Sequence, residues 1–119
     1  MTIYHVEYTP LFEENLKRYR SMRRQIRRKV GRVLKDPYAG TERLGEIPGG
    51  KDLRGCRSIR ITRNFRIIFV VCEECRRVPA CKFCFCEELP GETVVFITVG
   101  PHERAYAVRE EPVEYAVAL

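Results

Sequence analysis

Five of the six cysteines of this chain lie within fifteen residues, at Cys72, Cys75, Cys81, Cys84 and Cys86. Their spacing is C-x2-C, five residues, C-x2-C, and then one more cysteine after a single residue. Two C-x2-C motifs on the arms of one hairpin can bring four thiolates to a tetrahedral Zn²⁺, at about 2.3 Å each. The residues between them are mostly charged or small, so this segment has almost no apolar core, and a metal ion would supply its folding energy.

The spacing therefore predicts a structural zinc site in a hairpin insert over residues 72–86. The predicted ligands are Cys72, Cys75, Cys81 and Cys84. Cys86 is a substitute ligand, and a closed site of four thiolates leaves no open position for a substrate. A disulfide, a redox role and iron in place of zinc remain alternatives. The sixth cysteine, Cys56, is predicted to be a small buried apolar side chain.

The length and apolar content of the chain predict one domain, residues 1–119, because two independent cores would have too few residues each. The longest apolar runs, residues 67–72 and 94–99, fall far short of the roughly 20 residues that a membrane helix needs. The first ten residues have neither the basic nor the apolar region of a signal peptide. We therefore expect a cytoplasmic protein that does not associate with membranes.

Basic residues are unevenly distributed along the sequence. There are 22 Lys and Arg against 16 Asp and Glu, and the formal net charge is +6. Residues 17–32 hold nine basic side chains and no acidic one, and residues 51–66 hold six against one. Arginine predominates, and its planar fork of donors suits phosphate. The clustering predicts a polyanionic partner, nucleic acid or the ribosome. The alternatives are a solvated basic face and a docking site for an acidic protein. The predicted RNA-binding residues are Lys51, Arg24, Arg27 and Arg28.

Two helices are predicted after a short strand over residues 2–8. Thr9 has the position of an N-cap and Pro10 that of the first helical residue, and this helix is expected to end near residue 20. Ser21 is expected to cap a second helix. The apolar stripe of that helix is Met22, Ile26, Val30, Val33 and Leu34, and Asp36-Pro37 should end it. Residues 37–51, rich in Gly and Pro, are predicted to be a loop that Leu44 and Ile47 hold against the core.

From Gly55 onward the hydrophobic period falls to two, which predicts strands. A three-residue turn at residues 63–65, with Asn64 in the left-handed conformation, would pair Thr62 with Arg66. That register keeps the isoleucines together and places Arg60 and Arg66 on one sheet face. Residues 93–99, apolar on both faces, are predicted to be a central strand that Gly100-Pro101 ends. The expected fold class is α+β: two N-terminal helices packed on a small, mainly antiparallel β-sheet.

In this order of elements, three sequence motifs resemble the RelE/ParE toxin superfamily of type II toxin–antitoxin systems. They are Leu53-Arg54-Gly55, the hairpin RSIRITRNFRIIF and the terminal VGPHERAY. The resemblance covers roughly residues 2–71 and 93–108. It does not cover the cysteine-rich insert or the C-terminal tail, residues 109–119.

The resemblance implies a function. RelE-like members are ribosome-dependent endoribonucleases that cut mRNA, whereas ParE-like members poison DNA gyrase. The residues here are more similar to the ribonuclease branch, which implies that mRNA, the ribosome and a separate cognate antitoxin are the partners. The site residues that the resemblance implies are Arg66, His102, Tyr106, Arg54 and Arg60. Of these, Arg60 depends mainly on its place on the same sheet face as Arg66.

The implied chemistry is attack by the 2′-hydroxyl of the RNA on its own phosphodiester. His102 would transfer a proton, and Arg66 with Arg54 or Arg60 would hold the phosphate. Tyr106 would stack on a base or form a hydrogen bond near the phosphate. Two alternatives stay open: a ParE-like gyrase inhibitor, and a zinc-stabilised RNA-binding protein without catalysis.

Overall fold

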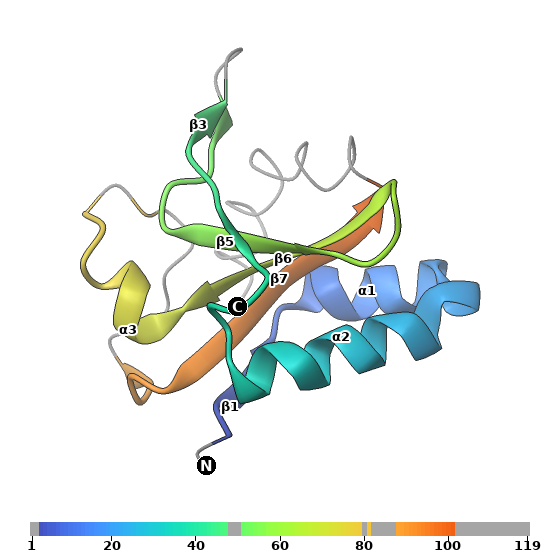
Figure 1. Cartoon of the computed structure of the whole chain (residues 1–119), viewed down its shortest axis with the longest axis horizontal. Coiled ribbons are helices and arrows are strands. Elements are labelled where there is room, and N and C mark those ends of the chain that lie inside the picture. Colours follow the sequence, from blue (N-terminus) through green and yellow to red (C-terminus); the bar gives the residue numbers. More distant parts are fainter. Residues whose placement is uncertain (1–2, 48–50, 80, 82–87, 102–119) are drawn as a thin grey trace.

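A five-stranded sheet forms the centre of the molecule, and two helices cover one of its faces (Figure 1). The computed structural model describes residues 3–47, 51–79, 81 and 88–101. The strand order in the sheet is β1-β7-β6-β5-β2, and β3 pairs with β4 in a separate two-stranded ladder. The elements, in chain order, are β1 (His5–Tyr8), α1 (Pro10–Arg18), a 3-10 turn (Arg20–Met22), α2 (Arg23–Lys35), β2 (Glu42–Arg43), β3 (Glu46–Ile47), β4 (Lys51–Asp52), β5 (Cys56–Arg60), β6 (Phe65–Val71), α3 (Cys72–Cys75) and β7 (Thr93–Pro101).

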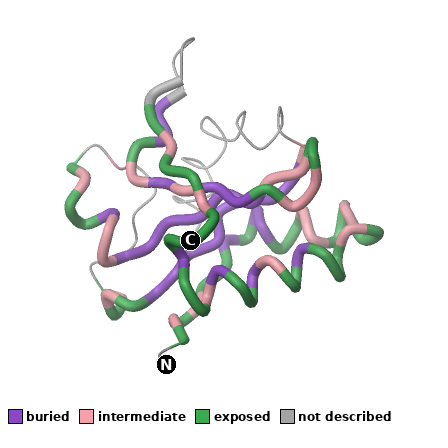
Figure 2. Tube along the Cα trace, in the orientation of Figure 1, coloured by how far each residue is buried: buried purple, intermediate pink, exposed green. Residues whose placement is uncertain are grey.

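Strand β7 is an interior strand of the sheet, as its sequence predicts. It pairs in parallel with β1 on one side and antiparallel with β6 on the other. Every residue from Thr93 to Gly100 is buried, because helices cover one face of the strand and the Cys-containing cluster covers the other (Figure 2). The predicted end of this strand, before Gly100-Pro101, is two residues too early: the strand includes both residues, and Pro101 pairs with Phe65.

The core divides into two clusters, one on each face of the sheet. On the helix face, side chains of α1 and α2 pack on those of β5, β6 and β7, with Phe12, Phe69 and Phe96 at the centre. The members of the cluster on the opposite face are Leu53, Cys56, Ile68, Val70, Cys72, Cys75, Val95 and Ile97, with Leu44, Cys81 and Leu89 packed against them. The predicted α+β class and mainly antiparallel sheet are confirmed, with β1–β7 as the one parallel pair among the described strands.

The start of α1 follows its local sequence signals. The Thr9 hydroxyl accepts a hydrogen bond from the Phe12 N–H at 3.1 Å and donates one to the Ile97 carbonyl at 2.6 Å. Pro10 occupies the first helical position, where a missing N–H costs nothing. Thr9 thus caps the helix and also fixes it to β7.

The predicted cap of the second helix is wrong. Ser21 lies inside the 3-10 turn, and Met22 precedes α2 without any side-chain cap. The Arg23 N–H already donates to the Arg20 carbonyl, so the turn itself satisfies a donor at the start of the helix. The predicted apolar stripe and the end at Asp36 are confirmed.

The β5–β6 hairpin has a three-residue loop, as predicted, but one residue earlier in the chain. The Ile61 N–H donates to the Phe65 carbonyl at 2.8 Å, and Arg60 lies opposite Arg66, so the predicted Thr62–Arg66 pair is wrong. The observed register places the buried Ile59 directly opposite the buried Ile67. Asn64 is not left-handed, since no described residue other than glycine has a positive φ.

The segment predicted as a loop contains three two-residue strands. β2 adds to the edge of the main sheet beside β5, with Glu42 opposite Ser58, and β3 and β4 pair with each other. Leu44 packs against the cluster on the face away from the helices, as predicted. The side chain of Ile47 lies outside the described residues. In the part of the chain that is described, no helix is long and apolar enough to cross a membrane.

Candidate functional site

Two arginines lie side by side where the β5–β6 hairpin approaches its turn. Arg66 is directly opposite Arg60, so both are on the same sheet face, as predicted. The Arg66 Nη1 donates to the Ser58 Oγ at 3.1 Å and pairs with the Glu42 Oε2 at 3.0 Å. The Arg66 side chain is 11% exposed and that of Glu42 64% exposed. Arg66 is therefore a fixed, largely enclosed cation whose carboxylate partner remains in water.

Glu42 and Ser58 were not among the residues that the sequence indicates. Glu42 reaches Arg66 because β2 pairs with β5, which places Glu42 opposite Ser58 on the same face as Arg66. A two-residue strand carries no readable hydrophobic period, so nothing in the sequence around Glu42 predicts this pairing. Ser58 does lie on the predicted Arg60 face, and its alternation with Ile59 is the signal that was available.

Arg54 is held by a carboxylate. Its Nε donates to the Asp52 Oδ1 at 2.8 Å and its Nη2 to the Asp52 Oδ2 at 2.7 Å, a two-point pairing. The Arg54 side chain is 47% exposed, whereas that of Asp52 is 10% exposed. The carboxylate therefore fixes the guanidinium at the surface just before β5. The side chain of Lys51, on β4, lies outside the described residues.

The structure separates the predicted RNA-binding arginines of α2 from Arg66. Arg24, Arg27 and Arg28 are exposed on α2, and that helix packs its apolar stripe on the sheet face opposite to Arg66. The described basic residues therefore lie on both sides of the sheet, on α2 and at the β5–β6 hairpin. His102 and Tyr106 lie outside the described residues; the described part of β7 ends at Pro101, one residue after Gly100, which lies opposite Arg66.

The described cysteines all belong to the cluster on the face away from the helices. Cys72 and Cys75 are buried on the single turn of α3, and the Cys75 thiol donates to the Cys72 carbonyl at 3.6 Å. Cys81 lies against Gly55, whose φ of +91° and lack of a Cβ allow the approach: a Cβ there would be 2.7 Å from the Cys81 Sγ.

Cys56 is buried, as predicted, but its contact with Cys81 was not. The hydrogen bond with the Cys81 thiol, together with burial, raises the pKa of the Cys56 thiol well above its usual value. Among the described residues, no three Cys, His, Asp or Glu side chains are grouped as ligands of one metal ion. Cys84 and Cys86 lie outside those residues, so the predicted zinc site stays a prediction.

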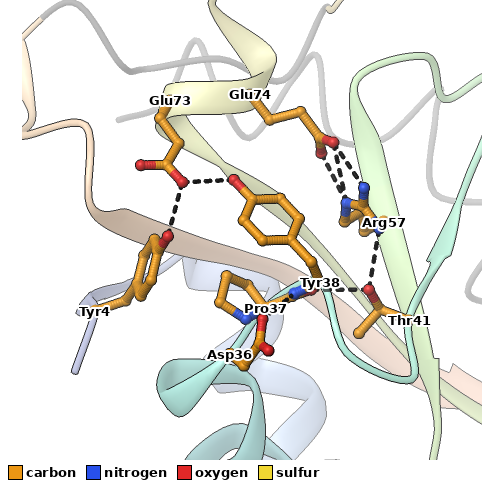
Figure 3. A network of polar contacts seen from close by, with 8 residues as sticks. All are labelled: Tyr4, Asp36, Pro37, Tyr38, Thr41, Arg57, Glu73 and Glu74. Atoms are coloured by element: carbon orange, nitrogen blue, oxygen red, sulfur yellow. Dashed lines mark hydrogen bonds and ion pairs between the residues drawn. The ribbon is translucent and has the colours of Figure 1, made fainter. Parts of the chain in front are cut away.

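Glu73 and Glu74 on α3 fix this helical turn to distant parts of the chain (Figure 3). One oxygen of Glu73 accepts from the Tyr4 hydroxyl at 2.7 Å and from the Tyr38 hydroxyl at 2.6 Å. Glu74 forms a two-point ion pair with Arg57 of β5, with closest N–O distance 2.8 Å. The start of the cysteine-rich segment is thereby attached to the N-terminus, to the turn after α2 and to the sheet.

The two phenols in this network have raised pKa values. Burial, followed by the hydrogen bond to Glu73, raises the pKa of Tyr4 to about 12. The same two causes raise the pKa of Tyr38 further. Each phenol is a donor to a carboxylate, so loss of its proton would place two anions in contact.

Comparison with known proteins identifies the architecture. No protein-family model and no curated protein sequence matches this chain. The solved structures that match include a YoeB/ParE toxin from Agrobacterium tumefaciens (TM-score 0.56, 19% identity, 82% of this chain and 98% of that chain), the toxin–antitoxin complex RelBE2 from Mycobacterium tuberculosis (0.55, 17%, 84% and 99%) and a mutant of the toxin RelE from E. coli in the free state (0.53, 17%, 98% and 97%).

The chain has the RelE/ParE toxin fold. This confirms, at the level of the fold, the resemblance that the three sequence motifs indicate.

The Glu73 network predicts a pH dependence. A phenol whose pKa is higher in the folded than in the unfolded state makes its full contribution to folding stability below pH 10.0, the pKa in the unfolded chain. That contribution is lost as the pH rises through about 12, the pKa of Tyr4 in the folded state. The free energy of unfolding of the wild type should therefore fall between pH 10 and pH 12. Glu73→Gln should lower both phenol pKa values, and absorbance at 295 nm should show more ionised tyrosine at pH 11 than in the wild type.

Glu13→Gln is the matched control, because Glu13 is exposed on α1. Its tyrosine titration should be that of the wild type. Equal titration curves for Glu73→Gln and Glu13→Gln would contradict the assigned hydrogen bonds.

Proposed function

We propose that this chain is the toxin of a type II toxin–antitoxin system, acts in the cytoplasm and cuts mRNA on the ribosome. The single observation that carries the proposal is the enclosed Arg66, paired across the strands with Arg60, on a sheet with the RelE/ParE fold. One of the similar structures is a toxin–antitoxin complex, which supports a cognate antitoxin as partner.

The proposed reaction is attack of a ribose 2′-hydroxyl on the adjacent phosphorus, with departure of the 5′-oxygen. The phosphorane on this path has more negative charge on its oxygens than the substrate, so fixed cations stabilise it. Arg66 is such a cation: Ser58 and Glu42 hold its guanidinium in place before RNA arrives. Arg60 lies next to it and adds positive charge. Arg54, held by Asp52, is a further phosphate ligand at the surface.

We assign the proton transfers to His102, with Tyr106 as a stacking residue for a base. Gly100 lies opposite Arg66, and His102 follows two residues later. The ordinary pKa of an imidazole, about 6.5, suits either the base or the acid of this reaction.

The exposed arginines of α2 and Lys51 are proposed to contact RNA of the ribosome or of the message. Arg24, Arg27 and Arg28 face solvent on the far side of the sheet from Arg66. They therefore position the protein on a polyanion and take no part in the reaction at Arg66.

A cleavage assay tests the proposed reaction. A reporter mRNA in a translating extract should be cut by the wild type, and Arg66→Ala should reduce the rate by about a hundredfold or more, as loss of a transition-state donor does. Arg66→Lys keeps the positive charge but lacks the paired N–H donors of the guanidinium, so it should recover only part of the rate. Lys35→Ala removes an exposed cation at the end of α2 and should cut like the wild type.

Inhibition of gyrase is the second candidate, because one of the similar structures is described as a YoeB/ParE toxin. Supercoiling by purified gyrase should be unaffected by the chain. Inhibition that Arg66→Ala leaves unchanged, with mRNA intact, would replace the ribonuclease by a gyrase inhibitor. A chain that neither cuts mRNA nor inhibits gyrase, but still binds RNA in a salt-dependent way, would favour the non-catalytic RNA-binding protein.

We also propose that the cysteine-rich segment binds one structural Zn²⁺. The predicted ligands are Cys72, Cys75, Cys81 and Cys84. Four thiolates are the donor set that zinc prefers, and Glu73 and Glu74 hold the segment's first turn in place. The bound ion would supply folding energy to a segment with few apolar residues.

Metal analysis tests this site. Protein purified without chelators should contain one zinc per chain, and Cys84→Ser should lose it. Cys56→Ala is the matched control: Cys56 contacts Cys81 but is not a predicted ligand, so this variant should retain zinc. Zinc lost from Cys56→Ala and retained by Cys84→Ser would overturn the ligand set, and iron in place of zinc would overturn the metal.

A further inference from the structure

A cavity of about 540 Å³ lies between β2, the turn after α2 and the α3 segment. Its lining residues are Tyr38, Arg43, Glu73, Glu74, Arg77 and Val78. None of them belongs to the Arg66 site. A volume of this size fits a small ligand or one unit of a polymer.

The charge around the cavity favours an anion. The carboxylate of Glu74 is engaged by Arg57, and that of Glu73 accepts two phenol hydrogen bonds. Arg43 and Arg77 are exposed, and neither has an ion-pair partner in the part of the chain that the structure describes. The phenol hydrogen bonds occupy an oxygen of Glu73 but do not cancel its charge, so among the described residues the lining carries two unpaired guanidiniums against one carboxylate without an ion-pair partner. The balance is positive, and guanidiniums are the groups best suited to phosphate.

The aromatic ring of Tyr38 lines the cavity and is held in place by several contacts. Its hydroxyl donates to Glu73 at 2.6 Å, its N–H donates to the Asp36 Oδ1 at 3.1 Å, and the Arg57 guanidinium lies 4.8 Å from its ring centroid (Figure 3). The residue is nonetheless 38% exposed and lines the cavity. A ring held in this way is prepared to stack on a flat partner at little entropic cost.

We propose that this cavity binds one nucleotide of single-stranded RNA, with the phosphate on Arg43 and Arg77 and the base against Tyr38. A phosphate and a π-face next to each other are the two features that a nucleotide offers, whereas an acidic peptide has no base to stack on Tyr38. The inference concerns a second RNA site and does not depend on whether the Arg66 site cuts RNA.

The direct test is a nitrogen-15 NMR titration of the full-length chain with AMP, with adenosine and with inorganic phosphate. AMP should move the signals of the Arg43 and Arg77 side chains and the Tyr38 amide, and should bind at least tenfold more tightly than phosphate or adenosine alone. Shifts confined to α2, or no saturable shift, would overturn the proposal. The same shifts with a short polyglutamate peptide, and none with AMP, would assign the cavity to an acidic protein.

Variants extend the test to RNA. Arg77→Gln and Arg43→Gln should each weaken binding of a fluorescein-labelled single-stranded decanucleotide and lower the slope of log K against log salt by about 0.7. Lys35→Gln, which removes an equal charge that does not line the cavity, should leave both quantities unchanged. Equal effects of all three variants would show that only net charge matters. A chain that binds AMP here and leaves mRNA uncut would refute the proposed function and keep this inference.

Discussion

The burial of β7 on both faces is the constraint on which the rest of the structure depends. Residues 93–100 have no exposed side, so both sheet faces must be covered. On one face Thr9 fixes α1 to the Ile97 carbonyl, and on the other face α3 and its cysteines complete the cover. The same strand also places Gly100 opposite Arg66, which connects the core to the proposed reaction site.

The first turn of the cysteine-rich segment is part of this core. Cys72 and Cys75 pack with Val95 and Ile97 of β7. Glu73 and Glu74, the two residues between those cysteines, point in other directions and make the polar contacts with Tyr4, Tyr38 and Arg57. One helical turn thus serves both purposes, because successive residues of a helix face different sides. The cavity beside Tyr38 is a consequence of this arrangement.

Features that depend on neighbouring residues were predictable from the sequence, and features that depend on distant pairing were not. The cap at Thr9, the stripe on α2, the interior strand β7 and the shared face of Arg60 and Arg66 are local patterns, and all are confirmed. The prediction that Ser21 caps α2 was wrong because a 3-10 turn satisfies a backbone donor at the start of the helix without any side-chain cap.

The hairpin register was two residues off, with Arg66 opposite Arg60 in place of Thr62, because alternation determines the face of a residue but not its partner on the next strand. Three contacts join distant parts of the chain: Glu42 with Arg66, Cys56 with Cys81 and Tyr4 with Glu73. Their separations along the sequence are 24, 25 and 69 positions. No spacing rule along the sequence connects such residues, so only the folded structure brings them together.

The most direct test of the central claim is the chemistry of the RNA ends that the chain produces in a translating extract. Attack by the 2′-hydroxyl leaves a 2′,3′-cyclic phosphate on one fragment and a 5′-hydroxyl on the other, at sites that require the ribosome. These are the ends that the account predicts. Fragments with 3′-hydroxyl and 5′-phosphate ends would contradict it, because such ends arise from attack by water.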